Sequence, residues 1–291
     1  MVKIVVLASF NMDLVMRAGR RPEAGETLRG EFAMHLGGKG FNQAVAARRL
    51  GADVTVVGRV GDDEFGRKFL DALDAEGIDR RFVAVDRHQG TGVASIVVEP
   101  DGTNTIVQAP RANLHTTADD IDRELGVIGD ADIAMFQLEL PNDAVLAFAR
   151  KARASGVPVI FNPAPAVPFD KNVWEHVDVC VANEIEAAQI EAGRPANVEV
   201  VRTLGSAGAS WQARSGQGHE PAFAVDAVDT TGAGDAFCGA FAVRLGEQAS
   251  FADAVSFANA AGALACTRHG AYPSMPRRDD VETLLAKGVH R

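Results

Sequence analysis

Residues 222–237 read Ala-Phe-Ala-Val-Asp-Ala-Val-Asp-Thr-Thr-Gly-Ala-Gly-Asp-Ala-Phe, an apolar run followed by two glycines and a carboxylate. The run at 222–228 predicts a strand, and Phe237, Phe241 and Leu245 then recur at helical spacing. The glycines therefore lie where a strand would pass into a helix. Unpaired backbone N–H groups at a helix N-terminus favour an anion, and glycine lets the anion approach closely. Gly232-Ala233-Gly234 is thus predicted to be an anion-binding turn.

Asp235 directly follows this turn and is the candidate catalytic residue. A carboxylate is repelled by a bound phosphate, so a purely structural turn would gain little from it beyond a helix cap. A base that accepts a hydroxyl proton, beside amides that hold a phosphoryl group, would explain the pair. An ordinary capped turn is the alternative, because short Gly-x-Gly motifs also occur without function.

The composition is that of a globular protein, with 291 residues of which 47% are hydrophobic and 23% charged. A formal charge of −10 argues against a nucleic-acid partner, which needs clustered Lys and Arg. No apolar run reaches membrane-spanning length, and the first strand-like run is too short for a signal peptide. Cys180, Cys238 and Cys266 show no CxxC spacing and are predicted to be buried thiols. We therefore expect a cytoplasmic protein without a membrane partner.

Short Val- and Ile-rich runs alternate with Ala-rich helical segments along the chain. The strand-like runs are 3–8, 54–60, 132–138, 157–161, 177–182, 198–204 and 222–228. The helix-like segments are 40–50, 64–76, 142–155, 235–246, 251–267 and 278–287. Apolar strands separated by helices indicate a parallel sheet covered on both faces. The sequence predicts one α/β sandwich domain over residues 1–291.

Two regions, 12–36 and 91–109, break this alternation, because their strand-like runs are joined by short turns rather than helices. They are predicted to pair as a small separate sheet. Such a sheet needs a covered face, so it could be a lid over a ligand, a dimer interface or both. Two hairpins without a function are the alternative.

Residues 37–42, Gly-Gly-Lys-Gly-Phe-Asn, open the helix after this region and resemble a P-loop only superficially. Gly40 replaces the required Ser or Thr after Lys39, and Ala33 stands at the first glycine of GxxxxGK. The turn still suits a polar ligand, with Lys39 and Asn42 as donors.

Further polar residues follow predicted strands, at the edge where parallel α/β sheets bind ligands. These residues are Asn11, Asp13, Glu139, Asn183, Glu186 and the segment 203–208. A solvated turn explains Asn11 and Asp13 equally well. A Rossmann dehydrogenase is disfavoured, because no glycine follows the first strand and Phe237 occupies the third glycine position of GxGxxG.

Several ordered motifs together resemble the PfkB carbohydrate kinase family, and within it the ribokinase branch, nearly from end to end. They are 9–13, 37–44, 58–63, 137–139, 162–165, 183–186, 203–205, 229–237 and 267–274. The resemblance implies a ribokinase-like three-layer α/β/α sandwich with a mainly parallel central sheet and a small β-sheet lid. The chain departs from the family at the crossover 184–197, which is shorter than usual in the family and near the minimum for parallel strands; either the crossover is reduced or residues are missing from it.

The resemblance implies three groups of site residues. The sugar would be held by Asn11, Asp13, Gly38, Lys39, Asn42 and Glu139, with Asp235 as the base. ATP would meet Asn183, Glu186 (through Mg²⁺ and water), Thr203, Gly205, Gly208, Gly232, Ala233 and Gly234, with Asn259 near the adenine. A potassium ion would be bound by Asp229, by the carbonyls of Thr231, Ala265, Arg268 and Gly270, and by Ser274.

The predicted function is therefore ATP-dependent phosphorylation of the primary hydroxyl of a pentose, with D-ribose as the first choice. A nucleoside kinase or another furanose kinase of the same family is the main alternative, and a sugar-binding regulator without catalysis is a third. The small sheet predicts a homodimer formed through the lid.

Overall fold

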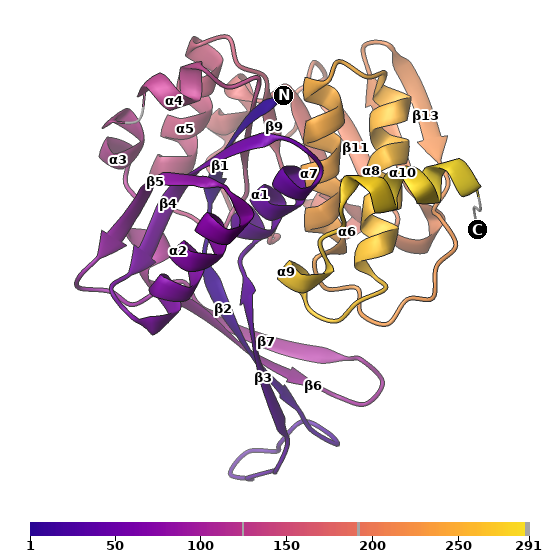
Figure 1. Ribbon diagram of the computed structural model, residues 1–291. Coiled ribbons are helices and arrows are strands. Elements are labelled where there is room, and N and C mark those ends of the chain that lie inside the picture. Colours follow the sequence, from indigo (N-terminus) through magenta and orange to yellow (C-terminus); the bar gives the residue numbers. More distant parts are fainter. Residues whose placement is uncertain (124, 191–192, 289–291) are drawn as a thin grey trace.

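The computed structural model describes residues 1–123, 125–190 and 193–288 and shows a layered α/β body with a small sheet that projects from it (Figure 1). In the described residues the central sheet has nine strands in the order β13-β12-β11-β10-β9-β8-β1-β4-β5. They are β1 (Lys3–Ala8), β4 (Asp53–Gly61), β5 (Asp79–Asp86), β8 (Ile133–Phe136), β9 (Val159–Phe161), β10 (Val179–Asn183), β11 (Glu199–Thr203), β12 (Ala209–Ala213) and β13 (Gly216–Glu220). The pairs from β5 to β11 are parallel, and β12 and β13 add to the edge in antiparallel pairs.

Helices cover both faces of this sheet. They are α1 (Lys39–Arg49), α2 (Glu64–Glu76), α3 (Ala118–Arg123), α4 (Leu125–Gly129), α5 (Asn142–Ala154), α6 (Glu184–Ile190), α7 (Ala233–Gly246), α8 (Phe251–Ala265), α9 (Ala271–Ser274) and α10 (Arg278–Lys287). Short 3₁₀ turns are η1 (Arg111–His115), η2 (Lys171–His176) and η3 (Gly205–Ala207).

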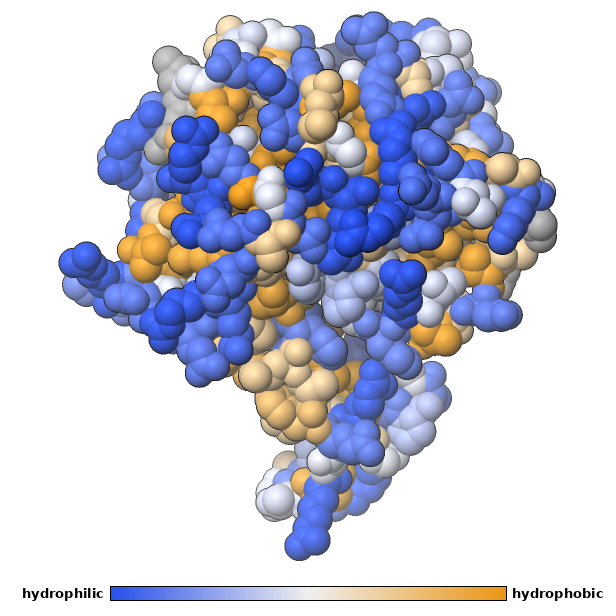
Figure 2. Space-filling model, viewed as in Figure 1, coloured by the Kyte–Doolittle hydropathy of each residue, from blue (hydrophilic) through white to orange (hydrophobic). Residues whose placement is uncertain are grey.

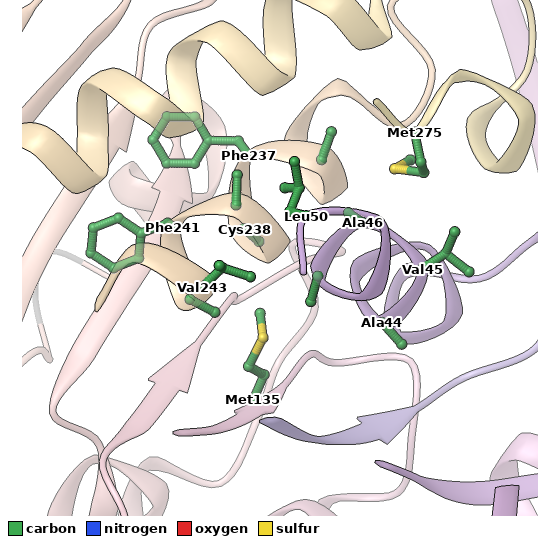
Figure 3. Packing of buried hydrophobic residues seen from close by; sticks show 14 of the residues in the cluster. Ala44, Val45, Ala46, Leu50, Met135, Phe237, Cys238, Phe241, Val243 and Met275 are labelled. Atoms are coloured by element: carbon green, nitrogen blue, oxygen red, sulfur yellow. The ribbon is translucent and has the colours of Figure 1, made fainter. Parts of the chain in front are cut away.

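Two hydrophobic cores, one on each face, follow from the alternation of side chains along β1. Ile4 and Val6 pack in one core with α1, α2, α7, α8 and α10, whereas Val5 and Leu7 pack in the other with α3, α4, α5 and α6. Figure 3 shows the first core where α1 and α7 meet above Met135 of β8. The three-layer α/β/α sandwich predicted from the sequence is confirmed.

The small sheet has the strand order β3-β2-β6-β7 and is called the lid sheet below. Its strands are β2 (Asn11–Arg17), β3 (Glu31–Gly37), β6 (Gly92–Val98) and β7 (Asn104–Ala109). The two predicted regions thus pair with each other, through a parallel contact between β2 and β6. The predicted small separate sheet is confirmed.

The predicted strand at 222–228 is wrong, because within it only Phe223 makes an isolated bridge. Phe223 is the only buried residue of this segment, and the other residues are partly or fully exposed and form no strand. The edge of the sheet is instead formed by the hairpin β12–β13, which the sequence analysis did not predict. Its polar strands, Ala-Ser-Trp-Gln-Ala and Gly-Gln-Gly-His-Glu, lack the apolar pattern on which the prediction relied.

The predictions for the cysteines and for the short crossover can also be compared with the structure. Cys180 and Cys238 are buried as predicted, but Cys266 is only partly buried. The predicted short crossover contains α6, and its residues 191–192 lie outside the described residues. Within the described parts of the chain, no helix combines the length and the apolar character that crossing a membrane would need.

Candidate active site

The predicted anion turn lies at the start of α7, but only part of it is open. Gly232 caps the helix with a left-handed backbone (φ 80°), and a Cβ there would lie 2.9 Å from the Cα of Ala271. Around Gly234, in contrast, the described residues beyond its own helix backbone and chain neighbours place no atom within 4 Å of where a Cβ would lie. The amide of Ala233 donates to the carbonyl of Thr230 at 3.2 Å, so it is already engaged. The free space of the turn is therefore at Gly234.

Asp235 points from α7 toward the start of α1. Its Oδ2 accepts from Asn42 Nδ2 at 3.0 Å, and its Oδ1 accepts from Gln43 Nε2 at 3.2 Å. The side chain is 8% exposed and lines a cavity of about 230 Å³ together with Lys39, Glu186 and Gly234. Burial raises the pKa of Asp235, against the opposing effect of Lys39 and the two amide donors.

Lys39 is the cation of this cavity. Burial alone would lower the pKa of its ammonium group, but the carboxylates of Asp235 and Glu139 hold that pKa above its ordinary value. Lys39 therefore stays protonated beside the predicted base. Its helix starts at Gly38, where a Cβ would lie 2.5 Å from the carbonyl oxygen of Ser9.

Both carboxylate oxygens of Glu139 accept hydrogen bonds, one of them from the backbone amide of Lys39. Its Oε2 accepts from Ser9 Oγ at 2.6 Å and from the Lys39 amide at 2.8 Å. Its Oε1 accepts from Gln108 Nε2, on the lid sheet, at 2.8 Å. Glu139 thus joins the body of the protein to the lid.

The predicted sugar ligands Asn11 and Asn42 are buried and incompletely satisfied. Asn11 Oδ1 accepts from Asn113 Nδ2 at 3.0 Å, whereas Asn11 Nδ2 and Asn42 Oδ1 find no hydrogen-bond partner among the described residues. A buried polar atom without a partner destabilises the protein, so a bound polar group that completes these bonds would be favoured. Hydroxyl groups can donate to one of these atoms and accept from the other.

Asp13 lies on the inner face of the lid sheet. Burial, followed by repulsion from Glu139 and Asp235, raises its pKa to about 7. With His35, Asp229 and His269 it lines a cavity of about 360 Å³ between the lid and the loop before α7.

The predicted nucleotide residues line a further cavity, of about 340 Å³, between the end of β11 and helices α7 and α8. The residues that line it include Thr203, Gly205, Gly208, Ala233, Gly234 and Asn259. Thr203, Thr230 and Gly234 belong to this cavity and also to the one around Asp235, so the two spaces adjoin. Asn259 Nδ2 donates to the carbonyl of Glu220 at 2.9 Å.

Asn183 and Glu186 form a reciprocal cap on α6. The amide of Asn183 donates to Glu186 Oε2, and the amide of Glu186 donates to Asn183 Oδ1, both at 2.9 Å. This cap is a structural explanation for both residues. It also fixes the Glu186 carboxylate at the wall of the cavity that contains Asp235.

The residues predicted to bind potassium gather around the ends of α8 and α9. Asp229 Oδ1 accepts from the amide and hydroxyl of Thr231, and its Oδ2 accepts from the amide of Gly270. Burial would raise the pKa of Asp229, but these donors, led by Gly270, lower it below its ordinary value. The carbonyl of Ala265 accepts from the amide of Arg268, and Ser274 Oγ donates to the carbonyl of Ala271. The donor set contains oxygen only, which fits a hard cation.

Four buried amide residues that contact the site were not assigned a role from the sequence. They are Gln43, Asn113, Gln137 and Asn162. Gln43 had a detectable signal, because it is a neutral polar residue in an otherwise alanine-rich helical stretch. The others come from separate segments, and only the fold brings them together.

Comparisons with known proteins agree with this geometry. A family model described as pfkB family carbohydrate kinase matches residues 1–278. The chain is 39% identical to the ribokinase of Bacillus subtilis (strain 168), over 97% of this chain and 99% of that protein. A ribokinase structure from Giardia lamblia has a TM-score of 0.91 at 31% identity and covers 99% of both chains. Arabidopsis thaliana ribokinase, complexed with ribose and ATP, has a TM-score of 0.87 at 30% identity, covering 98% of this chain and 99% of that one.

Proposed function

Because the chain belongs to the pfkB family of carbohydrate kinases, we propose that it transfers the γ-phosphoryl group of ATP to the primary hydroxyl of D-ribose, giving ribose 5-phosphate. The observation that carries this proposal is the placement of Asp235. This buried carboxylate lies between the incompletely bonded Asn42 and the open backbone at Gly234.

The acceptor sugar would lie between Asn11, Asn42 and Glu139, with its primary hydroxyl toward Asp235. Asp235 would accept the hydroxyl proton, and Lys39 and the amide of Gly234 would stabilise negative charge on the phosphoryl group. The protein has little covalent work in such a transfer, so the rate comes from alignment and charge stabilisation. Thr203, Gly205, Gly208, Gly232, Ala233 and Asn259 would hold the nucleotide on the other side.

Two cations belong to the proposal. Glu186 would bind Mg²⁺ through water, which fits its fixed carboxylate at the cavity wall. The oxygen groups around Asp229 would hold a potassium ion and so stabilise the turn before α7. The cytoplasmic location remains a prediction.

The acceptor can be tested by comparing ribose, fructose, adenosine, inosine and pseudouridine in a coupled ADP assay. We expect the highest kcat/KM with ribose. A preference for any nucleoside would replace the first choice by the nucleoside kinase. ATP binding without turnover on any alcohol would instead favour the sugar-binding regulator.

We also propose that the lid sheet forms a homodimer through its outer face. The strand register places Leu14, Met16, Phe32, Met34 and Val107 on the face opposite Asp13. Phe32 is 58% exposed and Val107 is 71% exposed, and Figure 2 shows apolar residues on the lid below the body. The lid sheet of a second copy would cover this face.

Light scattering at micromolar concentration should give twice the mass of the chain, and Phe32→Ser should lower the measured mass. A monomeric mass for the unchanged protein would refute the dimer.

A further inference from the structure

We propose that Gln43 is a positioning residue that fixes the carboxylate of Asp235 in its working orientation; this inference rests on the proposed role of Asp235 as the base. Gln43 follows Asn42 on α1, and its side chain is fully buried (0% exposed). Its Nε2 donates to Asp235 Oδ1 at 3.2 Å and to Asn162 Oδ1 at 3.1 Å.

The amide group of Gln43 is held in one orientation by its neighbours. Gln137 Nε2 donates to Gln43 Oε1 at 2.7 Å, and Asn162 Nδ2 donates to the carbonyl of Val181 at 2.8 Å. Since the amino group of Asn162 is engaged, its Oδ1 is the atom that faces Gln43. Turning the Gln43 amide over would therefore place oxygen against both Asn162 and Asp235.

This chain of amides connects Asp235 to the central sheet. Gln137 follows β8, Asn162 follows β9, and Val181 belongs to β10. Three adjacent strands of the large sheet thus support a side chain that reaches α7. These buried hydrogen bonds restrict the Gln43 side chain, which suits a group that must be aligned with a substrate, although Gln137 Oε1 has no hydrogen-bond partner among the described residues.

Asp235 receives one amide donor on each oxygen, from Asn42 and from Gln43. Asn42 is a predicted sugar ligand, whereas Gln43 does not line the cavity itself and hydrogen-bonds Asp235 and Asn162, which do. Neither amide can take up the proton that the base accepts. The two donors therefore fix the plane of the carboxylate and leave its remaining lone pairs for the acceptor hydroxyl.

The same contact affects the protonation of Asp235. Burial raises the pKa of Asp235, while Lys39 on α1 and the two amide donors lower it. Repulsion comes from Glu139 after β8 and Asp13 on β2; Glu186 on α6 and Cys238 on α7 also line or face the cavity. A base works when it is deprotonated, so losing the Gln43 donor should move the acid limb of the rate profile to higher pH.

The test compares Gln43→Met with Gln137→Met in single-turnover phosphoryl transfer from pH 5 to pH 9. Both changes replace a fully buried glutamine by an apolar side chain of similar length, but only the first removes a donor to Asp235. We expect Gln43→Met to shift the acid limb upward by about one pH unit and to lower the plateau rate about tenfold, with the sugar KM nearly unchanged. Gln137→Met should keep the wild-type limb, because Asn162 Oδ1 still accepts from Gln43 Nε2 and holds the Gln43 amide in its orientation.

Gln43→Glu provides a second variant if Gln43→Met folds poorly. It keeps the shape of the side chain and an acceptor for Gln137, but it places a second carboxyl beside Asp235. The pair would share a proton, so the acid limb should move further than in Gln43→Met.

The outcomes distinguish the role of Asp235 as the base from the positioning role of Gln43. Wild-type turnover in Asp235→Asn would show that Asp235 is not the base. If Asp235→Asn is impaired while folded Gln43→Met keeps the wild-type limb and rate, only the positioning role of Gln43 is refuted. An equal shift in Gln137→Met would also refute it, because the effect would then reflect general packing.

Discussion

The glycine-rich turns that open α1 and α7 look alike in sequence but serve opposite purposes. At α1, a Cβ on Gly40 would lie 2.5 Å from the Cα of Ala8 and 2.7 Å from the amide nitrogen of Ser9. At α7, a Cβ on Gly234 would lie more than 4 Å from every described atom beyond its chain neighbours and its own helix backbone. Gly40 is therefore required by packing between protein segments, whereas Gly234 leaves space for a ligand.

The charges of the two turns are complementary. The α1 turn carries Lys39, and the α7 turn carries Asp235, which raises the pKa of that lysine. Each turn thus places next to the shared cavity the charge that the other lacks. A glycine motif alone cannot tell packing from binding; the surrounding atoms can.

The largest expected effect concerns the charge on the α7 turn. Asp235→Asn keeps the size of the side chain but cannot accept the hydroxyl proton, so kcat should fall by about 10²–10⁴. Sugar KM should change little, because Asn42 and Glu139 remain. Steady-state kinetics in the ADP assay measures both, and an unchanged kcat would contradict the proposed base.

The next effect concerns the carboxylates that face the α1 turn. The pKa of Asp13 is raised to about 7 in the folded state from an unfolded value near 4, so the folded state binds the extra proton and the stability of the protein falls as pH rises through this window. Relative to Asp13→Asn, the wild type should lose about 2 kcal/mol of unfolding free energy between pH 5 and pH 8.

Denaturant unfolding without ligands at both pH values measures this difference. Asp143→Asn, at an exposed position of α5, controls for the change in net charge. If the difference in unfolding free energy between wild type and Asp13→Asn stays constant across the range, the pKa of Asp13 is not raised by its surroundings.

Gly40→Ala tests the packing side of the comparison. The added methyl group would overlap the backbone of β1 and the following residue, so we expect a loss of about 1–3 kcal/mol in stability. Thermal unfolding measures it. An unchanged melting temperature would mean that the start of α1 can shift away from β1.

Gly234→Ala is the matched change at the other turn and should have the smaller effect on the fold. Alanine is favoured over glycine within a helix, so stability should stay equal or rise by less than about 1 kcal/mol. The methyl group would occupy the space beside the nucleotide, and kcat/KM for ATP should fall between about 10- and 100-fold. Wild-type ATP kinetics would show that this space is not used.

The large sheet could be predicted from sequence because its strands are buried on both faces and read as continuous apolar runs, as in Lys3–Ala8. The lid sheet could be predicted from a different signal, because its strands are joined by short turns rather than helices. The hairpin β12–β13 was missed because an edge strand needs little apolar pattern. The run at 222–228 shows the converse, because this apolar run forms no strand and buries only Phe223.

At the site, the residues beside glycine turns or at strand ends could be predicted from the sequence. In the structure Lys39 and Asp235 line one cavity, and Asn42 donates a hydrogen bond to Asp235. The buried amide side chains that support the site could not be predicted, because their role depends on hydrogen-bond partners far away in the sequence. Gln43 and Asp235, for example, are 192 positions apart.

The connection between β1 and β2 consists only of Ser9 and Phe10, and it leads from the body straight into the lid sheet. Asn11 and Asp13 therefore belong to the lid sheet, while Asn42 on α1 and Asp235 on α7 belong to the body. A sugar that contacts both pairs would act as a cross-brace over this junction. Occupancy of the acceptor site would then restrain the lid sheet, whose outer face carries the exposed side chains of Phe32 and Val107.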